Sequence, residues 1–191
     1  TQGKLLIAPP NMPDPRFRKT VVYIWRHDVS GAAGVVINKK CQQPDFKHIC
    51  NEGLVHRLPK VNHPVYYGGP ILTNVVGVLH STDFILTSTN TLTEDKVGFT
   101  LDRKMLEVIA RGQGPKNMLI TLGMANWSTG QLEEELEHPR NPAMSWLIMD
   151  YDEKFVFGQL DEDKPDDLWE NCVNQAIRNK TQEITSKIFE D

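Results

Sequence analysis

Long apolar runs and cysteine are both scarce in this chain of 191 residues. No stretch approaches the roughly 20 consecutive apolar residues that a membrane helix needs, and the run at residues 5–8 is too short for a secretory signal. The three cysteines, Cys41, Cys50 and Cys172, form no CxxC pair. Their odd number and irregular spacing argue against disulfides and against a zinc site. We therefore expect free thiols, a cytoplasmic location, no membrane partner and no bound metal or other cofactor.

Excess positive charge is also missing. The formal net charge is −4, and no run of Lys and Arg stands out in the sequence. Nucleic-acid-binding domains usually carry a basic excess or a basic stripe, so this balance argues against direct nucleic-acid binding. The chain also lacks repeats, low-complexity tracts and linkers. We expect one domain over residues 1–179 and a polar C-terminal extension over 180–191, either helical or frayed.

The segments present alternate irregularly between strand and helix patterns. β-Branched and aromatic runs predict strands at residues 20–25, 32–38, 65–67, 75–80, 84–87, 118–122, 146–149 and 155–157. The first two of these should pair in an antiparallel hairpin. Helical spacing of apolar residues predicts helices within 45–54, after a cap at Asp102, from 128 and from 165. Short turns between strands and irregular helix placement favour an α+β fold.

The stretch LGMANWSTGQLEEEL, residues 122–136, lies between a strand and a helix. With Ser128 as N-cap, Gln131 completes a capping box, and Trp127 and Leu132 occupy the positions of a hydrophobic staple. A catalytic serine on a G-x-S-x-G turn is the competing interpretation, but the first glycine of that motif is missing. The nearby glutamates would repel a phosphate. We expect a structural joint, which leaves Gly130 unexplained because glycine weakens helices.

His80 is a second candidate for chemistry. It ends a predicted strand next to a hydroxyl, Ser81, and close to a carboxylate, Asp83. This neighbourhood suits a general base, although a hydrogen-bonded histidine at a strand end is the commoner occurrence. Gly68 and Gly69 could expose backbone N–H groups to a ligand, or could simply form a turn with positive φ.

Several of these stretches resemble signatures of the AlgH/YqgE family of bacterial proteins. The stretch LGMANWSTGQLEEEL is similar to its L-G-Y-A-G-W-x-x-G-Q-L-E-x-E-L motif, with Met124 and Asn126 in place of Tyr and Gly. Four further elements follow the family order: PPNMPDPRFRKTVVYIWRH, GAAGVVINK, VYYGGPI and GVLHS. Trp25 stands where many members have cysteine, so a thiol function at that position does not carry over.

The resemblance implies an α+β fold with a strongly bent, mostly antiparallel, partly barrel-like sheet and helices packed around it. It brings no agreed catalytic residues. One member is named after alginate regulation, which gives the family its label of transcriptional regulators. No helix-turn-helix is visible here. The residues that we consider candidates for ligand binding are Asn11, Asp14, Asn38, Gly68, Gly69, His80, Asn126, Trp127 and Gln131.

Two functional classes follow. The first is a non-enzymatic binding or regulatory protein that contacts an unknown protein or small molecule through a groove, with homo-oligomers as an open option. The second is a hydrolase-type enzyme that uses His80 with a nearby hydroxyl or carboxylate. A distinctive set of Gly, Asn, Trp and Gln positions without a nucleophile–base motif favours the first class.

Overall fold

A computed structural model of the chain describes residues 1–92, 94, 96–138, 140–158 and 167–189. Nine strands form one sheet: β1 (Leu5–Ile7), β2 (Val21–Asp28), β3 (Gly31–Val36), β4 (Val65–Tyr67), β5 (Ile71–Ser81), β6 (Asn90–Leu92), β7 (Val97–Thr100), β8 (Met118–Ser128) and β9 (Leu147–Met149). The helices are α1 (Phe46–Ile49), η1 (Cys50–Leu54), α2 (Arg103–Ala110), α3 (Gln131–Leu136), η2 (Pro142–Met144), α4 (Glu153–Val156) and α5 (Asp167–Phe189). No helix in the described residues could span a membrane.

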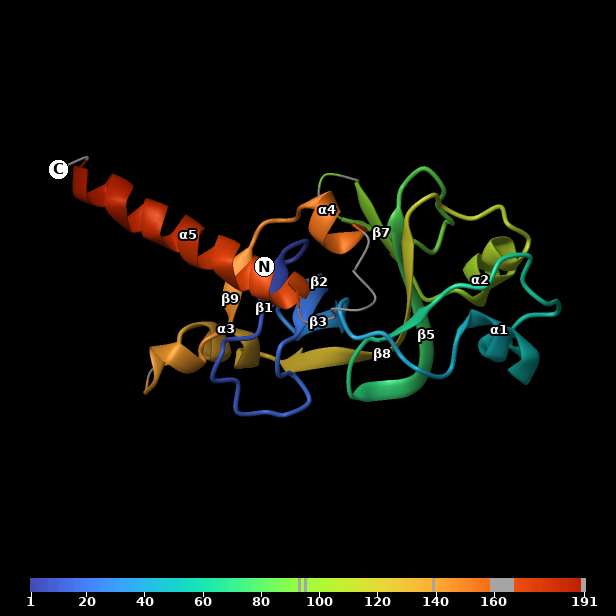
Figure 1. Cartoon of the computed structure of the whole chain (residues 1–191), viewed down its shortest axis with the longest axis horizontal. Coiled ribbons are helices and arrows are strands. Elements are labelled where there is room, and N and C mark those ends of the chain that lie inside the picture. Colours follow the sequence, from blue (N-terminus) through green and yellow to red (C-terminus); the bar gives the residue numbers. More distant parts are fainter. Residues whose placement is uncertain (93, 95, 139, 159–166, 190–191) are drawn as a thin grey trace.

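Strand β8 connects the two halves of the sheet. The strand order is β6-β7-β5-β8-β3-β2-β1-β9, and β4 pairs with β8 off this path as the parallel partner. The first part of β8 pairs with β4 and β5, whereas its last residues pair with β3. Helices α1 and α2 lie at one end of the molecule, and α3 and α5 lie towards the other (Figure 1). The predicted α+β fold with a curled, partly barrel-like, mostly antiparallel sheet is confirmed.

The core consists of three apolar clusters distributed along this curled sheet. One joins β1, β2, β3, β5 and β7 to the first turns of α5, and a second joins α1 and α2 to β4, β5 and β8. The third lies between β1, β2, β3, the end of β8 and α3, and it contains Trp127, Leu132 and Trp146. This third cluster supports the region in which most of the exposed candidate residues gather.

The chain passes across β8 between β4 and β5, and three glycines make this crossing possible. A Cβ atom on Gly68 would lie 2.3 Å from the carbonyl oxygen of Gly123, and one on Gly69 would lie 2.2 Å from the carbonyl carbon of Met124. Gly123 faces the same constraint, because its Cβ would lie 2.4 Å from the Gly69 oxygen. The Gly-Gly-Pro triplet is therefore a place where two backbones touch directly.

Two predicted strands are wrong. Residues 84–86 are irregular and lead into a turn at 87–88, which the Thr89 N–H closes by donating to the Leu86 carbonyl, and Phe84 and Leu86 pack against the cluster around α2. Residues 155–157 belong mainly to α4, because the Asp152 carboxylate caps a helix start by accepting from the Lys154 N–H. Local apolar runs predicted strands for both segments, but such short runs do not define the backbone conformation.

The C-terminal helix α5 begins at Asp167 in the described residues, whereas the predicted start at 165 lies outside them. It packs Leu168, Trp169, Cys172 and Val173 into the core. Beyond residue 180 its described side chains are all exposed, and the helix projects away from the sheet (Figure 1). The helix continues without a break across residue 180, and the boundary between domain and extension stays a prediction.

Candidate functional site

A cleft of about 330 Å³ opens beside the end of β8. One wall comes from the proline-rich loop after β1, another from α3, and a third from the segment around η2. Pro70 and Ile71, at the start of β5, complete the rim. The lining residues are Met12, Pro13, Asp14, Arg16, Phe17, Pro70, Ile71, Asn126, Trp127, Gln131, Glu135, His138, Met144 and Trp146. We call this feature the aromatic cleft.

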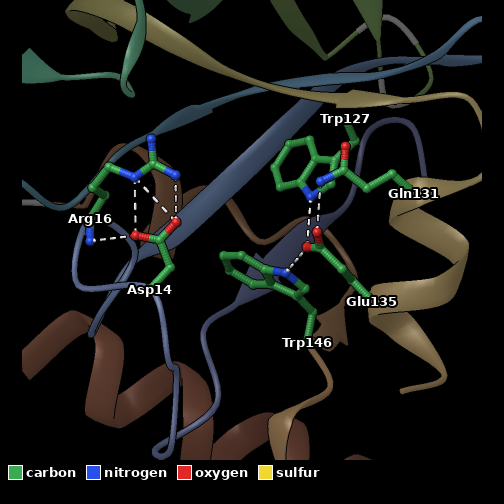
Figure 2. A network of polar contacts seen from close by, with 6 residues as sticks. All are labelled: Asp14, Arg16, Trp127, Gln131, Glu135 and Trp146. Carbon is green, nitrogen blue, oxygen red and sulfur yellow. Dashed lines mark hydrogen bonds and ion pairs between the residues drawn. The ribbon is translucent and has the colours of Figure 1, made fainter. Parts of the chain in front are cut away.

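Glu135 organises one side of the aromatic cleft. Its Oε2 atom accepts hydrogen bonds from the indole Nε1 of Trp127 at 2.9 Å and of Trp146 at 2.8 Å. Its Oε1 atom accepts from Nε2 of Gln131 at 2.8 Å. Figure 2 shows both indoles turned towards this single carboxylate. Hydrogen bonds to a charged acceptor are stronger than neutral ones, so one side chain of α3 fixes the orientation of both rings.

The indole rings belong to an edge-to-face aromatic group. Trp127 and Trp146 have ring centroids 6.0 Å apart at an interplanar angle of 79°. Phe17 from the proline-rich loop lies 5.7 Å from Trp146, also edge-on, and 6.3 Å from Trp127. Such geometries suit the quadrupoles of aromatic rings. Both indoles are buried, whereas Phe17 is half-buried, so the ligand-accessible part of this wall is mostly Phe17 and ring edges.

An ion pair forms the opposite side, as Figure 2 shows. The Nη2 of Arg16 donates to Oδ2 of Asp14 at 2.7 Å, and its Nε lies 3.0 Å from Oδ1. The Arg16 guanidinium holds the pKa of the Asp14 carboxyl below its ordinary value, chiefly through these hydrogen bonds. The pair presents a fixed cation and a fixed anion at the mouth of the aromatic cleft.

The structure brings together four of the nine candidate residues. Asp14, Asn126, Trp127 and Gln131 line the aromatic cleft, and both amide side chains are exposed there. Asn11 is exposed in the proline-rich loop but is not among the lining residues. Sequence reasoning missed Arg16, Phe17, Glu135, His138 and Trp146. The position of Glu135 one helical turn after Gln131 was a usable signal, since residues four apart share a helix face.

The remaining candidates have structural positions. Asn38 is completely buried: its Oδ1 accepts from the Val21 N–H at 2.8 Å, and its Nδ2 donates to the Lys19 carbonyl at 2.9 Å. It therefore ties the start of β2 to the end of the β3 region. Gly68 and Gly69 form the backbone crossing described above, and Gly69 adopts a φ of 150°. None of these three residues lines the aromatic cleft.

His80 is fully buried between β5 and β7, away from the aromatic cleft. Its Nδ1 lies 2.9 Å from the Ser81 carbonyl oxygen, to which it donates, and its Nε2 accepts from the Thr100 hydroxyl at 2.9 Å. The Ser81 hydroxyl donates instead to Asp83. Burial lowers the pKa of His80, so that the ring stays neutral. This environment matches the hydrogen-bonded strand-end histidine.

The buried ring of His80 predicts a pH dependence of stability. Because its folded-state pKa is below the unfolded value of about 6.5, His80 takes up its proton at a higher pH in the unfolded chain than in the folded one as the pH falls from about 7 to 5. Stability should drop over this window, by at most about 1.4 kcal/mol per pH unit for one group. Urea denaturation of wild type and His80→Asn at both pH values measures the difference in slope.

His63 has a pKa lowered by burial too, so the slope in His80→Asn should shrink without vanishing. Equal slopes in His80→Asn and wild type would contradict a neutral buried ring.

The predicted N-cap at Ser128 is wrong in position. Ser128 is the last residue of β8, and α3 begins at Gln131 after Gly130, whose φ of 76° explains the glycine at this site. Half of the capping box is nevertheless present, since Oε1 of Gln131 accepts from the Ser128 N–H at 3.0 Å. Trp127 and Leu132 are both buried in one cluster, as the staple predicts.

Ser128→Ala should therefore reduce the unfolding free energy by less than the loss of an N-cap would. The variant retains the backbone N–H bond to Gln131 and removes an exposed hydroxyl that donates to the same Gln131 oxygen at 3.1 Å. We expect a change within about 0.5 kcal/mol. Gln131→Ala should cost more, on the order of 1 kcal/mol, because the Ser128 N–H and the Glu135 carboxylate both lose a partner. Urea titrations of the two variants compare their losses of unfolding free energy. A larger loss in Ser128→Ala than in Gln131→Ala would support Ser128 as the N-cap.

Comparison with known proteins gives a consistent assignment. The profile of the family described as AlgH-like matches residues 5–180. A UPF0301 protein from Bradyrhizobium sp. is 35% identical over 172 residues, covering 86% of this chain and 77% of its own. A UPF0301 protein from Cereibacter sphaeroides is 38% identical over 163 residues, covering 85% of this chain and 86% of its own.

Two solved structures are similar in fold. The solution structure of the AlgH protein from Pseudomonas aeruginosa superposes with a TM-score of 0.67 at 33% identity, covering 82% of this chain and 80% of the other. A protein from Corynebacterium diphtheriae superposes with a TM-score of 0.66 at 21% identity, covering 91% and 85%. The chain thus belongs to the AlgH-like family.

Proposed function

We propose that this chain is a non-enzymatic binding or regulatory protein whose ligand occupies the aromatic cleft. The observation that supports this most directly is the arrangement around Glu135. One carboxylate fixes two indoles, while the amides of Asn126 and Gln131 remain exposed at the same opening. Rings held in place before binding lose little entropy when a ligand arrives, which is how a preorganised site gains affinity.

The aromatic cleft offers a definite combination of groups. Met12, Met144 and Phe17 supply apolar contact, Asn126 supplies both a donor and an acceptor, and Arg16 supplies a cation paired with Asp14. A volume of about 330 Å³ is within the range of small-molecule pockets. This combination suits a small organic molecule or a short peptide segment that carries an apolar group and several hydrogen-bonding groups.

The chemistry of the lining supports binding over hydrolysis. Apart from the imidazole of His138, whose Nδ1 accepts from the Asn141 N–H at 3.1 Å, the residues that form the aromatic cleft offer no hydroxyl, thiol or amine nucleophile. Both oxygens of Glu135 are occupied by hydrogen bonds, and the lowered pKa of Asp14 keeps it an anion and hence a poor general acid. His80, the base in the alternative hydrolase, is buried elsewhere and both of its ring nitrogens have partners.

A fragment screen tests this proposal. Ligand-observed NMR with a general fragment library should yield binders that also change the fluorescence of Trp127 and Trp146. Asn126→Ala should weaken those binders, whereas Asn174→Ala, at an exposed position on α5, should leave them unchanged. Fragments that bind Asn126→Ala as tightly as wild type would contradict binding in the aromatic cleft. Turnover of generic esters that disappears in His80→Asn would favour the hydrolase instead.

A further inference from the structure

Two segments far apart in the sequence form a row of cations at one end of the molecule. The loop after η1 contributes Arg57 and Lys60, and α2 contributes Arg103, Lys104 and Arg111 at or near its ends. All five residues are exposed. We call these five residues the basic strip. It lies at the end opposite the projecting C-terminal half of α5, where the loop after α1 runs beside α2 (Figure 1).

The loop is held against α2 at two points. Near the start of the helix, Nη2 of Arg103 donates to Nε2 of His56 at 2.9 Å. Near its end, the Lys60 N–H donates to the Ala110 carbonyl at 3.0 Å. Val55, which precedes the loop, is buried in the cluster beneath α2. The two segments therefore run in the same direction, and their basic side chains form one surface.

The charges of the basic strip are compensated only in part, since Asp102 lies beside Lys104. The five residues carry a formal charge of +5 in a chain whose net charge is −4. Glu107 lies in the same region, 3.9 Å from Nε of Arg103. Arg57 and Arg111 have no ion pair or side-chain hydrogen bond to any described residue. A partner with negative charge would supply the ion pairs that these two arginines lack among the described residues.

A groove of about 460 Å³ separates Arg57 from Arg111, and Val55, His56, Glu107 and Gln113 complete its lining. Beside this groove the same loop exposes two aliphatic side chains, Leu58 at 59% and Val61 at 58%. Cations around a groove next to exposed aliphatic groups match a segment that has acidic and apolar side chains together.

We infer that the basic strip is a docking surface for an acidic, amphipathic segment of a partner protein. Arginine guanidinium groups bind carboxylates in a two-pronged geometry, and the groove lets such a side chain reach both Arg57 and Arg111. Leu58 and Val61 then cover the apolar residues of the same segment. This surface is separate from the aromatic cleft and does not depend on its ligand.

Two other polyanions fit the surface less well. Along a nucleic-acid backbone the phosphates would gain nothing from Leu58 and Val61, which would be left against a charged surface. A flat anionic membrane could receive both aliphatic groups, but it would press lipid phosphates towards Glu107 without filling the groove. Both remain as alternatives that the experiment distinguishes.

The test uses a fluorescein-labelled peptide of about three helical turns with alternating Glu and Leu faces. Fluorescence anisotropy with the full chain should show saturable binding that weakens at least tenfold between about 0.05 M and 0.5 M salt. Arg57→Glu with Arg111→Glu should reduce affinity at least tenfold. Leu58→Ser with Val61→Ser should reduce it several-fold, because both contacts belong to one surface.

The matched control is Lys180→Glu with Lys187→Glu, which changes the net charge equally at exposed positions on α5. It should alter affinity less than twofold. A version of the peptide with Gln in place of Glu should not bind. All substitutions lie at exposed positions, and circular dichroism melting confirms that each variant folds; Arg57→Gln with Arg111→Gln replaces the charge reversal if that variant melts early.

Three outcomes would overturn the inference. The first is the absence of saturable peptide binding, and the second is equal loss in the control and the strip variants. The third is tighter, strip-dependent binding to phosphatidylserine vesicles or to duplex DNA than to the peptide, which would assign the surface to lipid or nucleic acid. Failure of the fragment screen at the aromatic cleft would affect none of these results.

Discussion

Gly69→Ala is expected to prevent the chain from folding to its native state. The added Cβ would lie 2.2 Å from the carbonyl carbon of Met124 and 2.3 Å from its oxygen, and both belong to backbone within β8. The φ of 150° adds strain for any residue with a side chain. Separating two backbones disrupts the pairing of β8 with its neighbours, so the cost should be at least about 4 kcal/mol. Circular dichroism with urea titration measures it.

Gly130→Ala is the control for this substitution. Gly130 also has positive φ, at 76°, but no atom lies within 4 Å of the Cβ that alanine would add. The substitution should therefore lower the unfolding free energy by only about 1 kcal/mol, the strain of a positive φ in a residue with a side chain. Gly68→Ala and Gly123→Ala should behave like Gly69→Ala, because each adds a Cβ atom where the same two backbone segments touch. A Gly69→Ala protein as stable as Gly130→Ala would refute the tight crossing.

Trp127→Ala is expected to produce the second large effect, a loss of about 3–5 kcal/mol in unfolding free energy. The indole is only 3% exposed, packs against Phe17 and Trp146, and donates to Glu135. Truncation leaves a cavity in the third core cluster and removes one of the three donors to a partly buried carboxylate. Chemical denaturation gives the loss, and the fragment screen gives the accompanying loss of binding.

Trp127→Phe separates packing from hydrogen bonding. The smaller ring retains much of the contact with Phe17 but cannot donate to Glu135, so an intermediate loss of about 1–3 kcal/mol is expected. Trp25→Phe is the matched control, because the Trp25 Nε1 atom has no hydrogen-bond partner among the described residues. Trp25→Phe should lose only the stability that comes from the difference in packing between the two rings. If the two substitutions cost the same, the Glu135 network contributes little to stability.

Local sequence patterns predicted much of the fold. β-Branched runs located β2 and β3, and the Asp102 cap located the start of α2, where Asp102 accepts from the Lys104 N–H as expected. The patterns failed at residues 84–87 and 155–157, where partly buried apolar side chains belong to an irregular segment and to a short helix. Burial alone does not distinguish these conformations, because any of them can direct a side chain into the core.

The sites were harder to predict because long-range contacts assemble them. Trp127 and Gln131 are close in sequence, and the sequence predicted both as candidate site residues. Trp146 reaches Glu135 only because the η2 segment packs there, and Arg16 enters the aromatic cleft only because the proline-rich loop folds over it. The basic strip was missed for the same reason. The sequence shows no run of Lys and Arg, since its five cations are divided between two segments more than 40 residues apart.

The position of β1 in the sheet has a consequence for biosynthesis. β1 lies between β2 and β9, and Ile7 faces Leu147, 140 residues later in the chain. At the usual rate of roughly 5–20 residues per second, a ribosome needs about 7–28 s to add the intervening segment. Throughout this interval the apolar strand Leu5–Ile7 has one hydrogen-bonding edge without its partner strand. The emerging polypeptide is thus exposed to mispairing until β9 has been synthesised, and β1 is where a nascent-chain chaperone would protect it most.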